Sequence, residues 1–344
     1  MLMANVWLFV IITVSVAAAA SSSEESESGS NSLSVRGLWQ WLAPHTPPVP
    51  PFFTGDRRPE GLDTGTEIQQ KLPNDPPSTP PYFVSLFDPA KNIAIYSAYK
   101  VTPTQAAGIG TYGRGAVNGN WRNPTGVAGV DAVYKKAITT DGQPLSRGHM
   151  NPSGINTFDT NFMKATFTLT NAAPQFETSN SGPWQKFEGR IRQYAQTTCG
   201  SNARRGTLYL LTGTSTIGLA PGPVQDTTIP LPYPGTNFNG VNLVTPRAVW
   251  TAGCCVWMEP GKIFGNWWKS ARAASFAVMS NNQNNKALLH QTEMSATQLE
   301  QLLTAPTKPR VNLFPGDANC RNLGNNIILP YSIKEPQEHY IRLC

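Results

Sequence analysis

The chain has 344 residues, of which 40% are hydrophobic and only 14% are charged, with 29 glycines and 30 prolines. This composition argues against a helical bundle and is typical of a loop-rich globular protein with one large or two small domains. The formal net charge of +6 favours a polyanionic partner, such as nucleic acid, an anionic membrane or an acidic glycan, without choosing among them. A basic protein with no such partner is the alternative.

Residues 1–20 predict a signal peptide. The apolar run from Val6 to Val16 is too short to span a bilayer comfortably, and four alanines ending at Ala20 follow it. Cleavage near Ala20 would give a secreted, extracellular protein with no stable membrane association. Because no Lys or Arg precedes the apolar run, an uncleaved anchor is the lesser alternative.

Residues 21–81 predict a disordered lead-in to a domain at residues 82–344. Residues 21–32 contain serine and glutamate but no hydrophobic side chain, and residues 41–81 are dense in proline. The glutamates of the first stretch have no basic neighbours, so its removal leaves a more basic protein. Four aromatic residues could still dock the lead-in onto the domain: Trp39, Trp41, Phe52 and Phe53.

The domain begins with residues 82–101, which predict a β-hairpin with its turn at residues 88–92. Residues 108–113 match the glycine pattern of a dinucleotide-binding turn, but no strand enters them directly and no helix start follows, so they are interpreted as a loop. Residues 131–138 predict a short helix, and residues 166–169 alternate as a strand does.

A helix is predicted after Pro183, which suits the first turn. Phe187, Ile191 and Tyr194 recur at the spacing of a buried helix face, and this places Glu188 and Arg192 side by side on one flank.

The last third of the chain predicts strands at residues 207–211, 248–256 and 275–279, the second interrupted at Gly253. Ser295 and Gln298 form a capping box that opens a helix reaching Thr304. Because strands and helices mix without a regular βαβ alternation, the predicted fold class is α+β, with a central mixed or antiparallel sheet flanked by helices.

Five cysteines predict two disulfides and one remaining thiol in an oxidising compartment. Adjacent Cys254 and Cys255 cannot easily pair with each other, so each is expected to reach a distant partner. No cysteine spacing is typical of a zinc site, and no nucleophile elbow supports a serine or cysteine hydrolase.

The residues that carry chemistry lie between positions 145 and 192. Of the four histidines, only His149 lies among polar residues and turn formers that could shape a site. An imidazole base, carboxamides that can face a hard cation, a carboxylate and several guanidiniums are what phosphodiester cleavage requires. Taken singly, each has a plainer reading: His149 as a structural residue, Asn171 and Asn180 as turn residues, Glu188 and Arg192 as an exposed ion pair.

Taken together, Arg147-Gly148-His149, Asn171 with Pro174-Gln175, and Asn180, Gly182, Trp184 and Glu188 resemble the DNA/RNA non-specific endonuclease family, the ββα-metal nucleases. Residues 95–99, 165–171 and 249–255 are similar to its secreted endonuclease domain-containing 1 branch. The resemblance covers roughly residues 82–320 and implies the ββα-metal nuclease fold.

The resemblance also implies a role for each residue. His149 would be the general base, and Asn180 the one direct protein ligand of Mg²⁺ or another divalent cation such as Mn²⁺. Glu188 would hold a water of that ion, and Arg147 and Arg192 would bind phosphate. Asn171 and Gln175 would support the site. The implied activity is hydrolysis of DNA and RNA with little sequence preference.

Two departures from the family pattern concern single residues. Ser146 stands where many members have aspartate before Arg-Gly-His, which affects only a supporting role. The arginine that members place well upstream of the histidine has Arg122 as its nearest candidate, a weak substrate-binding assignment. The alternative function is a catalytically inactive, extracellular polyanion-binding protein on the same fold.

Overall fold

A computed structural model of the chain describes residues 50–123, 129–140, 145–219, 236–238, 241–263 and 266–321. All of them belong to one compact unit, Val49–Cys344. The predictions for residues 1–49, including the signal peptide, and for Cys344 lie outside the described residues. Within the described part, no helix is both long and apolar enough to cross a bilayer.

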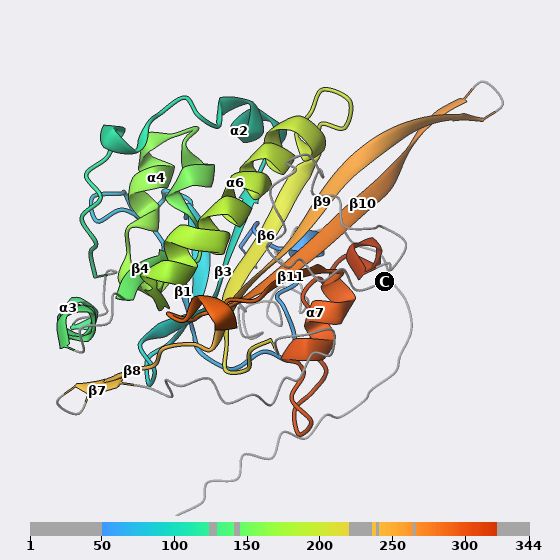
Figure 1. Cartoon of the computed structure of the whole chain (residues 1–344). Helices are drawn as coiled ribbons and strands as arrows, with labels where there is room; N and C mark the ends of the chain where they lie inside the picture. Colours follow the sequence, from blue (N-terminus) through green and yellow to red (C-terminus); the bar gives the residue numbers. More distant parts are fainter. Residues whose placement is uncertain are drawn as a thin grey trace, which may run out of the picture. The chain divides into compact units, whose positions relative to one another are not determined.

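The unit is built on a seven-stranded sheet with the order β1-β2-β3-β6-β9-β10-β11, in which every neighbouring pair is antiparallel (Figure 1). This confirms the α+β class with an antiparallel central sheet. The strands are β1 (Thr66–Gln70), β2 (Phe83–Asp88), β3 (Ile93–Val101), β6 (Thr207–Ser215), β9 (Ala248–Ile263), β10 (Asn266–Asn281) and β11 (Gln291–Met294).

Alternate side chains of the central strands point to opposite faces of the sheet, and a layer of other elements packs against each face. On one face, Leu210 and Phe276 pack with α6 (Gln185–Tyr194), whose buried face is the one predicted. On the other face, Leu211 and Trp250 pack with α7 (Ala296–Leu303), which the predicted capping box opens.

Shorter elements surround these layers. The α-helices are α2 (Pro103–Gly108), α3 (Val130–Thr140), α4 (Thr160–Thr166) and α5 (Glu177–Ser179). The helical turns include η1 (Thr54–Asp56), η2 (Arg114–Ala116), η3 (Ser153–Asn156), η4 (Leu169–Asn171), η5 (Asn180–Trp184), η6 (Ala195–Cys199), η7 (Lys286–Leu288) and η8 (Ala318–Arg321). Two further strand pairs are β4 (Leu145–His149) with β5 (Ala172–Phe176), and β7 (Thr236–Phe238) with β8 (Val241–Leu243).

Three predictions are corrected. Residues 166–169 are not a strand: Asp159 caps α4, which runs to Thr166, and the chain then passes through the interior with a single bridge between Thr168 and Arg122. Residues 166–169 are all buried, so the hydrophobic residues in this segment reflect its course through the interior and not pairing within a sheet. The strand at Gly253 is not interrupted, because the cross-strand ring of Phe276 occupies the space of the missing side chain.

The third correction concerns residues 50–81, which were predicted to be disordered. Phe52 and Phe53 are buried in the core on the α7 side of the sheet, and β1 pairs with β2 along its whole length. β1 is an edge strand of only five residues, so its sequence pattern is weak, and the surrounding prolines indicated an extended segment instead.

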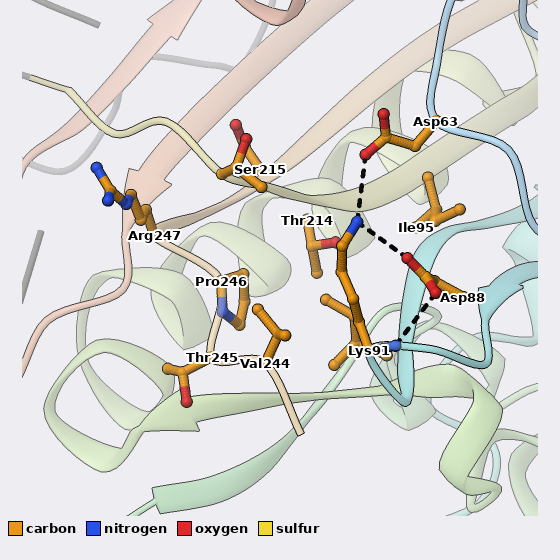
Figure 2. Close-up of a pocket in the computed structure, with 12 residues that line it drawn as sticks. Asp63, Asp88, Lys91, Ile95, Thr214, Ser215, Val244, Thr245, Pro246 and Arg247 are labelled. Carbon is orange, nitrogen blue, oxygen red and sulfur yellow. Dashed lines mark hydrogen bonds and ion pairs between the residues drawn. The ribbon is translucent and has the colours of Figure 1, made fainter. Parts of the chain in front are cut away.

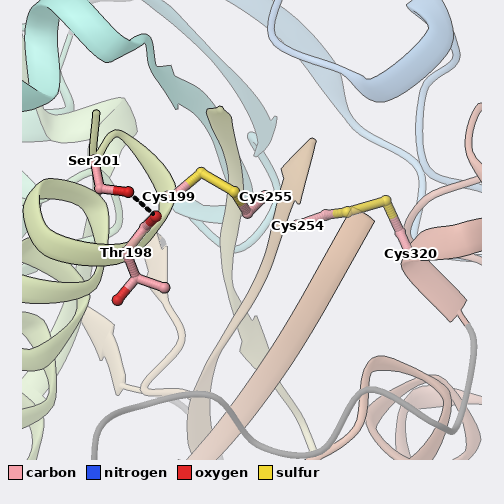
Figure 3. Close-up of a disulfide and its surroundings, with 6 residues drawn as sticks. All are labelled: Thr198, Cys199, Ser201, Cys254, Cys255 and Cys320. Atoms are coloured by element: carbon pink, nitrogen blue, oxygen red, sulfur yellow. Dashed lines mark hydrogen bonds between the residues drawn. A yellow bond between two sulfur atoms is a disulfide. The ribbon is translucent and has the colours of Figure 1, made fainter. Parts of the chain in front are cut away.

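Two disulfides join strand β9 to the layers on either side of the sheet (Figure 3). Cys199–Cys255 lies in the core below α6, and Cys254–Cys320 lies in the core below α7. Adjacent residues of a strand point to opposite faces, so neither cysteine can reach the other. The prediction that each reaches a distant partner is confirmed.

Candidate active site

The motif residues lie on a ββα unit that packs against the α6 face of the sheet. Strands β4 and β5 pair antiparallel, with Ser146 opposite Gln175 and Gly148 opposite Ala173. The chain continues from β5 through α5 and η5 into α6. Helical geometry breaks at Gly182, and Pro183 then leads into α6, as the sequence predicts. Residues far apart in the sequence thus share one face.

A polar cavity of about 380 Å³ opens between these elements. Five predicted site residues line it: Ser146, Arg147, His149, Asn180 and Glu188. The remaining lining residues are Arg114, Trp121, Leu145, Pro152, Ser153, Gly154, Glu177, Ser181 and Gln185. The imidazole and the carboxamide named as base and metal ligand therefore face one shared space.

The Asn180 carboxamide is held in one orientation. Its Nδ2 donates a hydrogen bond of 2.9 Å to Ser146 Oγ, and Ser146 Oγ donates one of 3.2 Å to the Gln175 carbonyl. Since the amide nitrogen is engaged, Oδ1 is the atom left to accept a donor or bind a cation in the cavity. The Ser146 hydroxyl therefore holds the Asn180 carboxamide without a carboxylate at this position.

His149 lies at the end of β4, between aromatic rings. The Trp121 ring centroid is 4.5 Å from that of the imidazole, and the Phe167 centroid is 4.9 Å away. Burial lowers the pKa of His149 to about 3, and the positive charge of Arg114 acts in the same direction. The imidazole is therefore neutral at mild pH and can accept a proton.

Glu188 lies on the first turn of α6 and lines the same cavity. Burial raises the pKa of Glu188 to about 8, and Arg192, one helical turn further on, opposes this rise. A carboxyl group with this pKa gains a proton at neutral pH unless a cation comes close to it. Glu188 and an approaching cation are therefore electrostatically linked.

Three arginines supply positive charge at the cavity. Arg147 lines it, and its Nε is buried without a hydrogen-bond partner among the described residues. Arg192 is exposed and packs over Gly154 at the cavity wall. Arg114 of η2 also lines the cavity, with its guanidinium 6.0 Å from the Phe167 ring centroid.

The two supporting residues are fully buried. Asn171 Oδ1 accepts hydrogen bonds from the Asn151 backbone N–H and the Ser97 hydroxyl, at 2.7 and 2.8 Å, so it braces the chain just after His149. Gln175 packs against Gly148, where a β-carbon would lie 1.6 Å from its Oε1. Neither residue lines the cavity.

The structure does not place Arg122, the sequence-based candidate for substrate binding, at the cavity. Its guanidinium donates to the carbonyl groups of Lys164, Ala165 and Phe167 at the end of α4, and it does not line the cavity. A helix end leaves carbonyls without partners, and an arginine side chain satisfies them. Arg114, rather than Arg122, is the arginine upstream of the motif that lines the cavity.

The cavity is also lined by Arg114, Trp121 and Glu177, which no motif in the sequence predicts as site residues. Arg114 directly follows the glycine-rich loop at residues 108–113, and Trp121 precedes Arg122. Their one sequence signal was a cationic and an aromatic residue in a loop upstream of the motif. Glu177 accepts a hydrogen bond from Ser181 at the cavity edge.

A second cavity, of about 230 Å³, lies at the end of the central sheet (Figure 2). Lys91 lies between Asp88 and Asp63 there, with Nζ–Oδ2 distances of 2.9 and 3.6 Å. None of the predicted site residues lines this cavity. Its opposite charges are already paired within the protein, so the ββα cavity is the better candidate for catalysis.

The donor set of the ββα cavity fits a hard divalent cation. Within the described ranges, no three His, Cys, Asp or Glu side chains gather as a metal cluster. Mg²⁺ usually keeps several waters and takes only one or two protein oxygens. The oriented Asn180 Oδ1, with the Glu188 carboxyl lining the same cavity, meets that requirement.

The fold places the candidate site residues together on a ββα unit, around one polar cavity. The family described as DNA/RNA non-specific endonuclease matches residues 64–305, so the chain belongs to this family. The match begins upstream of the domain start predicted at residue 82 and includes β1.

Individual relatives share less of the chain. Nuclease EXOG, mitochondrial, from mouse and from human is in each case 42% identical over 55 residues, which is 16% of this chain and 15% of the relative. The chain therefore matches only a small part of these proteins. A crystal structure of an EndoG/EndoGI complex aligns with a TM-score of 0.43 and 16% identity, covering 64% of this chain and 80% of the other.

Proposed function

We propose that the protein is a secreted, Mg²⁺-dependent endonuclease that hydrolyses phosphodiester bonds of DNA and RNA. His149 is the general base, and Asn180 binds the divalent cation. The observation that carries the proposal is the shared cavity: the imidazole and the oriented carboxamide line one polar space, together with Arg114 and Arg147.

Each residue performs a separate task. The neutral imidazole of His149 accepts a proton from the attacking water. Arg114 and Arg147 bind the phosphate and place its phosphorus beside that water, and Arg192 extends the positive charge at the rim. When bound at Asn180, the cation supplies charge neutralisation at the phosphate and at the leaving oxygen.

Recognition of the backbone rather than the bases gives little sequence preference, because phosphate contacts carry no sequence information. The net charge of +6 supports this mode of binding. Binding to phosphates releases counterions from the nucleic acid, and this release becomes less favourable as the salt concentration rises. The affinity for nucleic acid is therefore expected to fall steeply with salt.

Secretion forms part of the same proposal. The two disulfides favour an oxidising compartment, and residues 1–20 have the composition of a cleaved signal. Expression of the full chain in a secretory cell line, followed by N-terminal sequencing of protein in the medium, tests this point. Protein retained in the cell with an intact amino terminus would overturn it.

The test of catalysis is a plasmid-nicking assay with and without Mg²⁺. His149→Ala is expected to lose two to four decades of activity, roughly the contribution of a general base. His290→Gln, a histidine outside the cavity, is the matched control and is expected to retain activity. Cleavage that persists in EDTA, or in His149→Ala at the wild-type rate, would rule out this mechanism.

The second candidate is an inactive protein that binds polyanions on the same fold. Ser146, in place of the family aspartate, is the observation that favours it. The same assay separates the two, since an inactive binder would shift DNA in a gel at low salt without nicking it at any Mg²⁺ concentration.

A further inference from the structure

Trp121 lines the cavity beside His149, and the proposed hydrolysis gives it no role. Its ring plane is inclined by 43° to the imidazole, at a centroid distance of 4.5 Å. Phe167 meets the same imidazole edge-on, at 4.9 Å and 88°. The two aromatic rings also contact each other, at 5.6 Å. We call this pair, Trp121 and Phe167, the aromatic bracket.

A general base needs a fixed orientation, and in many hydrolases a carboxylate bonded to the second imidazole nitrogen provides it. His149 Nε2 is instead buried with no hydrogen-bond partner among the described residues. No described residue bonded to Nε2 orients the ring, which leaves packing against neighbouring side chains as a means of doing so. Within the described part of the chain, the imidazole has ring contacts with Trp121 and Phe167.

Arg122 fixes the two halves of the bracket to each other. Its backbone N–H donates to the Phe167 carbonyl at 3.1 Å, and the Leu169 N–H donates to the Arg122 carbonyl at 3.0 Å. The guanidinium adds hydrogen bonds to the carbonyls of Ala165 and Phe167, at 3.1 and 3.3 Å. The segment that carries Trp121 is thereby tied to the segment that carries Phe167.

We propose that Trp121 is a positioning residue for the reaction: the aromatic bracket, held closed by Arg122, sets the plane of the His149 imidazole in the cavity. This inference rests on the proposed function of His149 as the base. It also gives Arg122 a task, through the bracket, in place of the substrate contact expected from the sequence.

The surroundings of the imidazole agree with this role. Apolar ring surface disfavours the charged imidazolium, in line with the lowered pKa of His149. The charged groups that line the same cavity are Arg114 of η2, Arg147 of β4, Glu177 of α5 and Glu188 of α6. Arg114 opposes protonation of His149, so the bracket and this guanidinium act together.

The first test compares Trp121→Phe, which keeps an aromatic ring, with Trp121→Leu, which removes it. Trp121→Leu is expected to lower kcat by about tenfold or more while KM for DNA stays within about twofold, because a misplaced base slows the chemical step. Trp121→Phe is expected to restore most of kcat, and Arg122→Met to reproduce part of the loss. Trp257→Leu is the matched control, since Trp257 stacks on Arg204 outside the cavity.

The second test does not need activity. The protein contains four histidines, so NMR titration of labelled imidazoles is tractable, with His149 assigned through His149→Asn. The pKa of His149 is expected to lie well below its usual range in the wild type and in Trp121→Phe. In Trp121→Leu it is expected to rise by about one unit or more, and the acid limb of the kcat profile to move with it.

Two results would overturn the proposal. An unchanged His149 pKa together with an unchanged kcat in Trp121→Leu would show that the ring does not position the base. A raised KM at constant kcat would make Trp121 a surface for stacking bases instead. If Trp121→Leu fails to fold, Phe167→Leu repeats both measurements on the other half of the bracket. If the wild type lacks nuclease activity, the proposed function fails while the NMR titration still decides the role of the bracket.

Discussion

The hydrogen bond from Asn180 to Ser146 leads to a quantitative expectation for cation affinity. Ser146→Ala removes the acceptor of the Asn180 Nδ2 bond, which is 2.9 Å long and partly buried. Such a bond contributes about 1 kcal/mol net, and its loss also lets the carboxamide turn its nitrogen toward the cation. One kcal/mol is a factor of about five, and partners that orient metal ligands often contribute tenfold. We therefore expect Mg²⁺ affinity to fall about five- to tenfold.

The assay is the Mg²⁺ dependence of plasmid nicking at saturating DNA, with Mn²⁺ binding followed by electron paramagnetic resonance in the absence of DNA. The midpoint for the cation should shift, and the rate at saturating Mg²⁺ should stay within about twofold of the wild type. Ser146→Asp should shift the midpoint the other way, because a carboxylate adds negative charge near the cation.

Ser153→Ala is the matched control, since this serine lines the same cavity but is not the acceptor of the Asn180 bond. If Ser146→Ala and Ser153→Ala gave the same cation midpoint, the orientation argument would be refuted.

Three further expectations follow from the geometry. Burial raises the pKa of Glu188 above its unfolded value, so the free energy of unfolding of the metal-free protein should fall as pH rises from about 4.5 to 8. Glu188→Gln should remove this pH dependence. After allowance for solvent screening, the substitution should stabilise the protein by ~2 kcal/mol at pH 9 and by little at pH 4, as measured by urea unfolding in EDTA. Equal effects at both pH values would contradict the burial of this carboxyl. Gly148→Ala places a β-carbon 1.6 Å from Gln175 Oε1, so the free energy of unfolding should fall by about 1–3 kcal/mol and plasmid nicking should slow. The double variant Gly148→Ala with Gln175→Ala should recover part of this stability. If it recovers none, the strain lies elsewhere. The Cys254–Cys320 bridge closes a loop with a sequence separation of 66, so its removal by paired serine substitutions should cost about 4 kcal/mol in denaturant unfolding, and an unchanged midpoint would refute the entropic estimate.

Local signals predicted several of the elements that carry or flank the candidate site. The motif residues Ser146, Arg147 and His149 lie on one short strand, and Glu188 lies on the predicted helix, α6. A few neighbouring residues likewise predict the capping box at Ser295 and the buried face of α6. Patterns of this kind depend on backbone geometry within one element, so the sequence carries them in full.

Contacts between distant segments were beyond the reach of these signals. Arg114 and Trp121 line the cavity, whereas the Arg122 guanidinium is hydrogen-bonded to carbonyl groups at the end of α4. Both placements depend on how the segment after α2 packs against α4. Cys254 and Cys255 were expected to reach distant partners, yet their choice of Cys320 and Cys199 depends on which face of β9 each occupies. No spacing in the sequence determines such a choice.

The sequence by itself determined the family and the fold class, because its motif residues, taken in order, resemble the DNA/RNA non-specific endonuclease family, whose model the chain matches. The tertiary structure alone decided which upstream residues complete the candidate site, how Asn180 is oriented and what holds His149 in place. The physical reason is that hydrogen bonds and ring contacts between segments far apart in the chain exist only once the sheet has brought those segments together.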